Sequence, residues 1–242
     1  MTTDILGKIS VIRHSCVRID CGRIIYIDPF MVDGAPHDAD IILITHPHFD
    51  HFSPRDIKKV MKDSTVIAGP SMIAGPCRLL TGRKPDTVSP GQRTTLCGIS
   101  IEVIAAYNKA FTRPHKRFLN WVGYVIDTGE ERIYITGDTD DIPEARAVNC
   151  DMLMLPVGGS NYTMDAAEAA ALTNAIHPDT VIPIHYGALL GGEDAPNSFK
   201  AKLDKEINCE IRNTVYSHAM IWAYSIAGAG IGLLLGMYLL VR

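Results

Sequence analysis

The residues best suited to chemistry form one dense cluster early in the chain. The sequence Thr-His-Pro-His-Phe-Asp-His at 45–51 places His46, His48, Asp50 and His51 within six positions. Neutral imidazole and carboxylate are ligands that zinc, manganese and iron accept. The cluster follows a compact apolar run, and a chain that turns at the end of a strand can bring such side chains together. Four ligand-type side chains at this density favour a metal site over a structural role.

The cluster matches in full the signature His-x-His-x-Asp-His, and through it the chain resembles the metallo-β-lactamase superfamily. Further segments of that family recur in order between about residues 7 and 187: His14-Ser15, Ile27-Asp28-Pro29, Gly137-Asp138-Thr139-Asp140, Leu155 to Gly159, Tyr162-Thr163-Met164 and Ile182 to Tyr186. Within the family, the chain is most similar to small metal-dependent hydrolases of the ascorbate-lactone hydrolase and N-acylethanolamine phospholipase D types. The resemblance implies an α+β fold, a four-layer αββα sandwich, that holds two divalent metal ions.

The resemblance also implies the remaining ligands. The third ligand of the first metal should be His115, because no other histidine lies between the signature and the Gly-Asp motif. Its loop, 108–120, departs from the shorter version of some relatives, and the alternative is a solvated loop histidine. Asp138 would bridge both ions, and His185 would complete the second. The expected metal ligands are therefore His46, His48, Asp50, His51, His115, Asp138 and His185.

Other polar residues near these motifs are candidates for supporting roles. A carboxylate that accepts the second ring N–H of a ligand histidine fixes its tautomer and orientation. Asp28 is such a candidate, although it also suits a turn before Pro29, and His14 is a second candidate. We expect substrate contacts from Asn108, Asp140, Asn161 and Tyr186. The histidines outside the motifs, which we expect to be structural, are His37, His177 and His218.

This ligand set predicts hydrolysis by a hydroxide that bridges two metals. Two ions at roughly 3.5–4 Å lower the pKa of a shared water from about 15.7 toward 7. The hydroxide would attack an ester, a lactone or a phosphodiester, so the expected partner is a small-molecule or lipid-like ester substrate. Asp138 and Asp50 are the expected catalytic residues, Asp50 as both ligand and proton acceptor. Zinc is the expected metal, with manganese and iron as alternatives.

Two other functions use the same residues. A di-iron oxidoreductase is one, although such relatives usually carry a flavin domain, for which 242 residues leave no room. A non-catalytic, membrane-attached metal-binding protein is the other, and it is disfavoured because no ligand position is lost. The formal net charge of −4 provides no basic footprint, so we expect no nucleic-acid partner.

Composition and pattern indicate one globular domain over residues 1–215. Charged residues make up 21% of the chain and hydrophobic ones 47%. None of the six cysteines forms a Cys-x-x-Cys pair, so we expect reduced thiols. Apolar and β-branched runs predict strands at 8–12, 16–20, 23–27, 41–45, 65–68, 99–105, 122–127, 132–136, 152–155 and 181–184. Helices are predicted at 53–62, at 163–176 with Thr163 as its cap, and at 196–206.

The end of the chain, residues 216–242, differs from the rest. Residues 219–241 are 23 positions without a formal charge. As a helix they would span roughly 34 Å, against about 30 Å of hydrocarbon. Gly228, Gly232 and Gly236 repeat every four residues, a pattern that lets helices approach closely in lipid and favours self-association. Because the N-terminus lacks a secretory pattern, we expect a cytoplasmic domain anchored by a C-terminal transmembrane helix; a buried helix or a subunit interface is the alternative.

Overall fold

The fold is built from two sheets packed face to face. The computed structural model describes residues 5–159, 162–187 and 192–212. The first sheet has six strands in chain order: β1 (Ile9–Arg13), β2 (Cys16–Asp20), β3 (Ile24–Ile27), β4 (Ala39–Leu43), β5 (Met61–Pro70) and β6 (Asp86–Val88). The second has seven in the order 13-12-11-10-9-8-7: β7 (Arg93–Leu96), β8 (Ile99–Ala105), β9 (Val122–Asp127), β10 (Arg132–Ile135), β11 (Met152–Pro156), β12 (Thr180–Ile184) and β13 (Asn208–Cys209).

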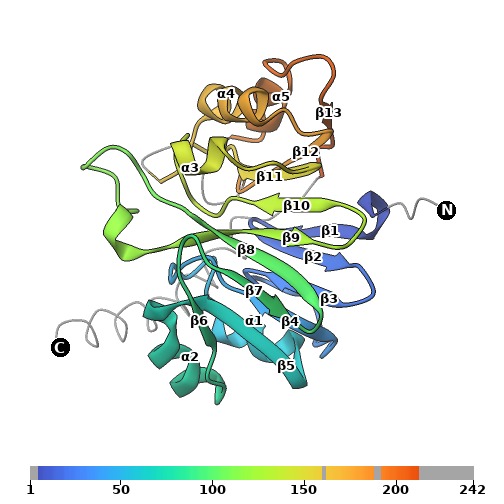
Figure 1. The fold of residues 1–242 in the computed structure, drawn as a ribbon, viewed down its shortest axis with the longest axis vertical. Helices are drawn as coiled ribbons and strands as arrows, with labels where there is room; N and C mark the ends of the chain where they lie inside the picture. The colour runs from blue at the N-terminus through green and yellow to red at the C-terminus, as the bar shows by residue number, and fades with distance from the viewer. Residues whose placement is uncertain (1–4, 160–161, 188–191, 213–242) are drawn as a thin grey trace.

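Helices cover the outer faces of both sheets. The five α-helices of the described residues are α1 (Pro54–Val60), α2 (Ala74–Thr81), α3 (Pro143–Arg146), α4 (Ala166–Ile176) and α5 (Ala195–Lys200). Figure 1 shows α3, α4 and α5 gathered at one end of the molecule, near β11 and β12, and α1 and α2 at the other end. The predicted four-layer αββα sandwich of the α+β class is confirmed.

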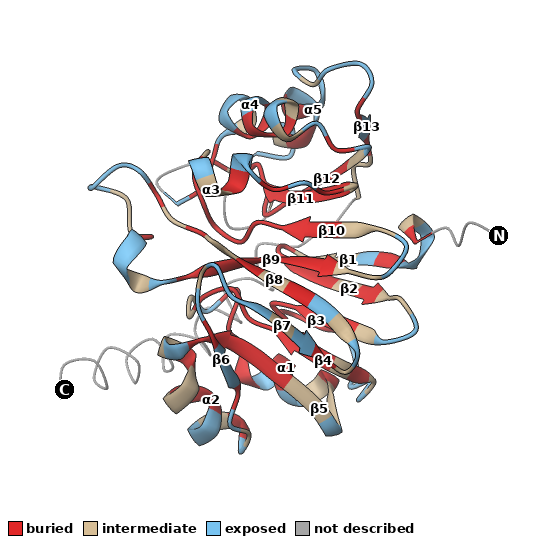
Figure 2. Ribbon diagram, in the orientation of Figure 1, coloured by how far each residue is buried: buried red, intermediate tan, exposed pale blue. Residues whose placement is uncertain are grey.

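The alternation of side chains along the strands explains the layering. One face of each sheet points to the other sheet, where Ile25 and Ile41 of the first share a core with Ile126, Ile133 and Met154 of the second. The opposite faces pack under the helices in two further cores. Strands covered on both faces become apolar throughout; every residue of β11 is buried, and Figure 2 shows the buried strands inside more exposed helices.

Hydrogen bonds join the two sheets beside the end of β4. The Tyr124 hydroxyl donates to the Ile44 carbonyl at 2.6 Å, and the Val122 N–H donates to the Thr45 carbonyl at 3.2 Å. Gly137 lies at the same junction with φ +64°, and a Cβ there would meet the Val122 carbonyl oxygen at 2.8 Å. A glycine is therefore required directly before Asp138, both for its backbone conformation and for the close approach.

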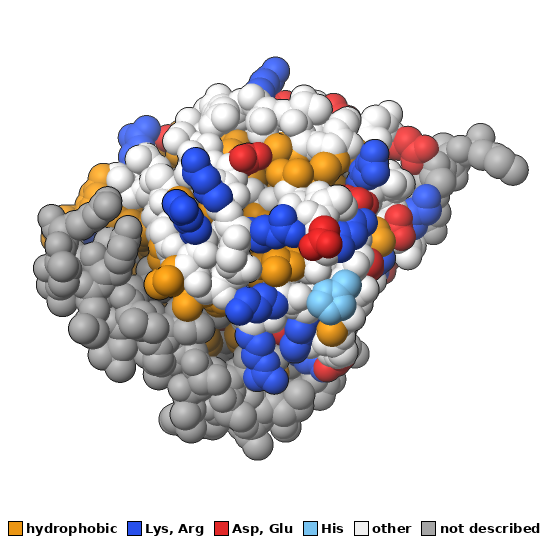
Figure 3. Space-filling model, turned by 90° about the horizontal axis from the view of Figure 1, so that it is seen from below, with side chains coloured by type: hydrophobic (Ala, Val, Ile, Leu, Met, Phe, Trp, Pro, Cys, Tyr) orange, Lys and Arg blue, Asp and Glu red, His pale blue; other side chains and the backbone are white. Residues whose placement is uncertain are grey.

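Figure 3 views the molecule from the side of α1 and α2. Lysine and arginine side chains gather on this face, with carboxylates and hydrophobic side chains among them. Ion pairs in this half of the molecule join Lys62 to Asp40 at 2.8 Å and Arg83 to Asp63 at 3.3 Å. Neighbouring carboxylates therefore offset part of the positive charge.

Several predicted elements differ from the observed ones at their ends. The predicted helix 53–62 ends at Val60, because the chain passes directly into β5. The predicted helix 196–206 ends at Lys200, and the predicted strand 41–45 ends at Leu43. The sequence did not indicate α2, α3, β6, β7 or β13, most of which are short. All six cysteines are free thiols, as expected.

The cap of α4 is Asp165, so the prediction of Thr163 was wrong. The Asp165 carboxylate accepts from the N–H groups of Ala167 and Glu168, both at 2.8 Å. The Glu168 carboxylate in turn accepts the Asp165 N–H at 3.1 Å. This reciprocal pair is a capping box, which satisfies more of the open N–H groups at the start of the helix than one threonine hydroxyl would.

The expected membrane anchor is corrected. Its segment, 216–242, lies outside the described residues. Within 5–159, 162–187 and 192–212 no helix is long and apolar enough to cross a bilayer. The longest described helix, α4, has 11 residues, whereas a span needs about 20. We therefore withdraw the membrane location. Self-association through Gly228, Gly232 and Gly236, also outside the described residues, stays a prediction.

The α4 cap gives a test of the fold. Replacing the cap in Asp165→Ala should lower the free energy of unfolding by about 1 kcal/mol, because two helix N–H groups lose their acceptor. Urea unfolding followed by circular dichroism measures the change. Asp165→Ser, which keeps a capping oxygen, is the matched control and should lose less; an unchanged free energy of unfolding in Asp165→Ala would show that the cap does not stabilise α4.

Candidate metal centre

All seven predicted ligands meet at one end of the strands. Four follow β4, Asp138 follows β10, His185 follows β12, and His115 comes from the loop between β8 and β9. Parallel pairing of β10, β11 and β12 brings the carboxyl ends of these strands to the same edge. Six of the seven are buried, and His48 is half-buried. Segments distant in the chain thus supply one compact cluster.

The first group contains three histidines and Asp138. The Nδ1 atom of His48 lies 3.0 Å from Nε2 of His46 and 3.3 Å from Nε2 of His115. Oδ2 of Asp138 lies 3.8 Å from both Nε2 atoms. Nitrogens bound to one tetrahedral zinc at about 2.0–2.1 Å are roughly 3.3 Å apart. The three ring nitrogens therefore have the spacing of atoms that share a cation.

The second group shares Asp138 with the first. Its Oδ1 lies 3.4 Å from Nε2 of His51, and its Oδ2 lies 3.4 Å from Nε2 of His185. Oδ2 of Asp50 lies 3.6 Å from the same atom of His51 and 3.5 Å from that of His185. Asp138 thus stands between the two groups, with a different oxygen toward His51 than toward the first group.

Unsatisfied polar atoms in the cluster fit bound cations. Among the described residues, Nε2 of His51, Oδ1 of Asp138 and Nε2 of His185 are buried without a hydrogen-bond partner. A buried polar atom without a partner costs roughly 1–3 kcal/mol, and more when it is charged. All three atoms belong to the second group, where one cation would satisfy them. The first group fits a second cation through the 3.0–3.3 Å spacing of its ring nitrogens.

His14 lies against the second group. Its Nε2 is 3.2 Å from Oδ2 of Asp50, and with Asp50 and His185 it forms a third set of potential ligands. Two imidazoles that bind one tetrahedral zinc place their ring centroids roughly 5 Å apart. The pairs among His46, His48 and His115 lie at 4.6–5.2 Å, whereas the rings of His14 and His185 lie at 3.8 Å. That separation is shorter than a shared ion would give, and the two rings are tilted by 37°, so His14 packs against His185 and supports Asp50.

The second ring nitrogen of three histidines has its own partner. Nδ1 of His51 lies 2.7 Å from Asp28 Oδ2, and Nδ1 of His115 lies 2.9 Å from the Tyr162 carbonyl oxygen. The Thr45 hydroxyl donates to Asp28 at 2.6 Å and therefore accepts from Nδ1 of His46 at 2.9 Å. These contacts leave each Nε2 directed toward the cluster. Asp28 thus occupies the supporting position expected of it.

Burial and mutual contacts shift the ionisation of the cluster. Burial lowers the pKa of His115 and of His14 to about 4, and the pKa of His46 falls well below its usual value for the same reason. Burial also opposes charge on His51, but Asp138, Asp50 and Asp28 raise its pKa to about 10. Despite burial, neighbouring histidines lower the pKa of Asp138 and hold that of Asp50 well below its usual value.

The predicted substrate contacts lie elsewhere or have other partners. Asn108 and Asp140 are buried and bonded to each other at 2.9 Å. The Tyr186 hydroxyl donates to the Arg212 carbonyl at 2.8 Å. Asn161 lies outside the described residues, as does His218. Two of the histidines expected to be structural contribute to the backbone arrangement. Nδ1 of His37 contacts the Met61 carbonyl at 2.9 Å, and His177 is the C-terminal cap of α4.

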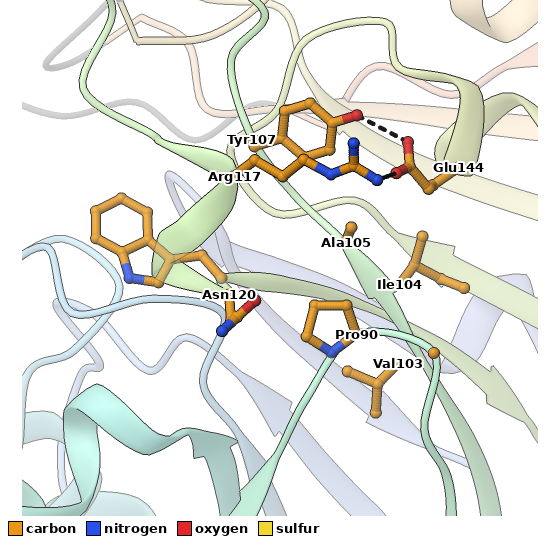
Figure 4. Close-up of a pocket in the computed structure, with 10 residues that line it drawn as sticks. Pro90, Val103, Ile104, Ala105, Tyr107, Arg117, Asn120 and Glu144 are labelled. Atoms are coloured by element: carbon orange, nitrogen blue, oxygen red, sulfur yellow. Dashed lines mark hydrogen bonds and ion pairs between the residues drawn. The ribbon is translucent and has the colours of Figure 1, made fainter.

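Trp121 is a neighbour of the cluster that the sequence did not reveal. Its ring lies 4.9–5.1 Å from those of His46, His48 and His115. It also lines a cavity of about 420 Å³, whose remaining walls come from residues such as Pro90, Val103, Tyr107, Arg117, Asn120 and Glu144. Figure 4 shows the Tyr107, Arg117 and Glu144 side chains close together at one side of this cavity. No motif surrounds Trp121, so only the fold could place it here.

Comparison with known proteins agrees with this geometry. The family model described as the beta-lactamase superfamily domain matches residues 8–185, and the chain belongs to this superfamily, in its metallo branch. A curated relative, a UPF0173 metal-dependent hydrolase of Thermoplasma acidophilum, is 29% identical over 200 residues, which cover 78% of this chain and 87% of the relative. The finer resemblance to the ascorbate-lactone hydrolase and N-acylethanolamine phospholipase D types stays a prediction.

Solved structures share the fold. A metallo hydrolase from Ignicoccus hospitalis superposes with a TM-score of 0.69 at 21% identity and covers 85% of this chain and 94% of its own. A di-iron β-hydroxylase from Streptomyces venezuelae reaches a TM-score of 0.70 at 14% identity, covering 85% of this chain and 52% of its own. These likenesses show the fold alone, so the choice of chemistry depends on the site.

The buried histidines give a pH test on the metal-free protein. Folding keeps His115 and His14 neutral, while the unfolded chain binds protons below about pH 6.5. The unfolded state therefore binds more protons, and the free energy of unfolding should fall between pH 6.5 and about 4, by on the order of 3 kcal/mol for one such ring. His51 does not change the free energy of unfolding in this pH range. Its pKa is about 10 in the folded protein, so below pH 6.5 the ring is protonated in both the folded and the unfolded state.

Urea unfolding of chelator-treated protein at several pH values measures this dependence. His115→Gln removes one of the rings with a lowered pKa, which include His14 and His46, and should make the acid slope less steep. An unchanged slope in that variant would show that His115 does not contribute.

Proposed function

We propose that this protein is a metal-dependent hydrolase that uses two divalent metal ions, with zinc as the expected metal. Family membership and the naming of a relative as a metal-dependent hydrolase support the general class. One observation carries the binuclear form: two groups of ligand atoms share Asp138, and buried atoms in both His51 and His185 have no partner among the described residues.

The proposed mechanism assigns separate tasks to the side chains. When bound, two divalent ions lower the pKa of a water toward 7 and polarise the substrate oxygen. Asp138 holds the two groups in one arrangement and offsets positive charge between them. Asp50, whose side chain is 11% exposed, is open enough to accept a proton while His14 holds its Oδ2. His51 is oriented by Asp28 at 2.7 Å.

The proposed substrate is a small molecule with an ester, lactone or phosphodiester bond. Attack at carbon or phosphorus needs the same nucleophile and the same stabilisation of a developing oxyanion. The fold does not choose among these substrates. Among the described residues, the cavity beside Trp121 has no metal ligand in its wall, and the Trp121 ring connects it to the first group of histidines.

The shared carboxylate gives the first functional test. Asp138→Asn removes the charge between the two groups, so we expect metal content to fall from near two ions toward one or none. Hydrolysis of ester, lactone and phosphodiester probes should fall by about 10²-fold or more, the scale of losing one stabilising group in a site. Metal analysis by mass spectrometry and initial rates measure both effects.

His37→Asn is the matched control, because this exposed histidine lies outside the cluster and asparagine tolerates its φ of 48°. It should keep both metal content and rate. Two ions retained in Asp138→Asn with an unchanged rate would exclude Asp138 as the shared ligand, and wild-type protein that binds fewer than two ions would exclude the binuclear proposal. A wild-type protein that holds iron and turns over no ester would instead support the oxidoreductase alternative.

A further inference from the structure

We propose that Asp140 is a positioning residue that shapes the loop carrying His115. The loop comprises residues 108–116 and is called here the His115 loop. This inference rests on the proposed function in one respect, that His115 is a metal ligand. It assigns to Asp140 and Asn108 a task different from the substrate contact expected from the sequence.

Three donors from the His115 loop converge on the Asp140 carboxylate. Oδ1 accepts from Nδ2 of Asn108 at 2.9 Å and from Nη1 of Arg113 at 2.7 Å. Oδ2 accepts from the Lys109 N–H at 2.8 Å. Asp140 is 4% exposed, and hydrogen bonds to an ionised acceptor are stronger than those between neutral groups. The start and the middle of the loop are therefore held by one buried carboxylate.

Asn108 carries this constraint to His115. Its Oδ1 accepts the His115 N–H at 3.1 Å, and its own N–H donates to the His115 carbonyl at 2.7 Å. Its Nδ2 also donates to the Tyr162 carbonyl at 2.9 Å, the same oxygen that Nδ1 of His115 approaches at 2.9 Å. The backbone and the ring of His115 are thus fixed by Asn108 and by the oxygen that Asn108 holds.

Asp140 is itself held in place by the turn after β10. Its N–H donates to the Tyr107 carbonyl at 3.0 Å, and the Thr139 hydroxyl lies 3.1 Å from both the N–H and the carbonyl oxygen of Tyr107. Asp138, two residues earlier, belongs to the ligand cluster. One short turn therefore fixes a shared ligand directly and a distant ligand through Asp140.

The existing contacts disfavour a substrate role for these two residues. Both oxygens of Asp140 accept from the loop, and both the carbonyl and the amide of Asn108 are used. Each is about 95% buried, with exposures of 4% and 5%. A substrate would have to displace bonds that hold His115, so the pair acts on the site through the loop.

The test compares Asp140→Asn with the wild type in two measurements. The new amide offers a donor where a loop N–H needs an acceptor, so the loop should loosen. In metal-free protein, hydrogen exchange of the Lys109 and His115 amides should accelerate at least tenfold. In zinc titrations, affinity for one of the two ions should fall about 10- to 100-fold, the usual effect of losing a partner of a ligand histidine.

Asn108→Ala should give the same selective loss, and the double variant should add little because both changes break one network. Glu144→Gln is the matched control. Glu144 accepts from the Tyr107 hydroxyl and from Arg117, both at 2.9 Å, and these two residues flank the loop (Figure 4). This variant should leave zinc affinity within about twofold and exchange at His115 unchanged.

The outcomes separate this inference from the proposed function. Unchanged exchange at His115 and unchanged zinc affinity in Asp140→Asn would overturn the positioning role, as would an equal loss of both ions with a loss of folded structure. Wild-type protein that binds two ions but hydrolyses no probe would refute the function and leave the positioning role standing. Faster amide exchange in Asp140→Asn, together with a wild-type protein that binds no zinc, would support the role of Asp140 in the loop and refute the metal centre.

Discussion

The concentration of histidine and aspartate side chains in a buried site is the constraint on which the rest of the structure depends. Water that would stabilise their charged forms is excluded, so each group must find a partner or stay neutral. This explains why burial holds His46 and His115 neutral, while three carboxylates favour a charged His51. A site with so many nitrogens and oxygens facing inward is costly unless cations bind, which is why stability and metal content should be linked.

Rigid surroundings contributed by both sheets offset the free-energy cost of burying these polar groups. The backbone N–H of His185, after β12, donates to the His14 carbonyl in the turn between β1 and β2 at 3.1 Å. Tyr124 of β9 donates to Ile44 after β4. The ligands follow strands whose other residues are locked in the core, so small displacements of a ligand would require movement of a packed sheet. The fold thus fixes the ligand geometry before any ion binds.

Local patterns made part of the site predictable from the sequence. The signature after β4 carries four ligands within one turn, so their proximity did not depend on the rest of the fold. His115 and Asp138 required the family resemblance, because loop 108–120 is long and its path depends on partners distant in the chain. The roles of Asn108 and Asp140 could not be read in advance: a buried asparagine and a substrate-binding asparagine look alike until their hydrogen bonds are seen.

The same reasoning explains the errors in the secondary structure. Thr163 and Asp165 are both residue types that cap helices. Asp165 is the cap because the Glu168 carboxylate accepts a hydrogen bond from its N–H and completes a capping box. The short strands β6 and β13 lack a periodic pattern of their own, because neighbouring strands supply their pairing. For residues 216–242, hydrophobicity alone suggested a span, and that segment lies outside the described residues.

The turn after β10 shows how one stretch of sequence can set two parts of a site. Gly137 allows the close approach to Val122, Asp138 enters the cluster, and Asp140 turns toward the His115 loop. Because these residues are adjacent, a shift of the turn would displace a shared ligand and loosen a distant one together. Coupling of this kind favours a centre in which both ligand groups form or fail as a unit. The selective loss expected from Asp140→Asn arises because the variant leaves the backbone of the turn intact and removes only its hold on the loop.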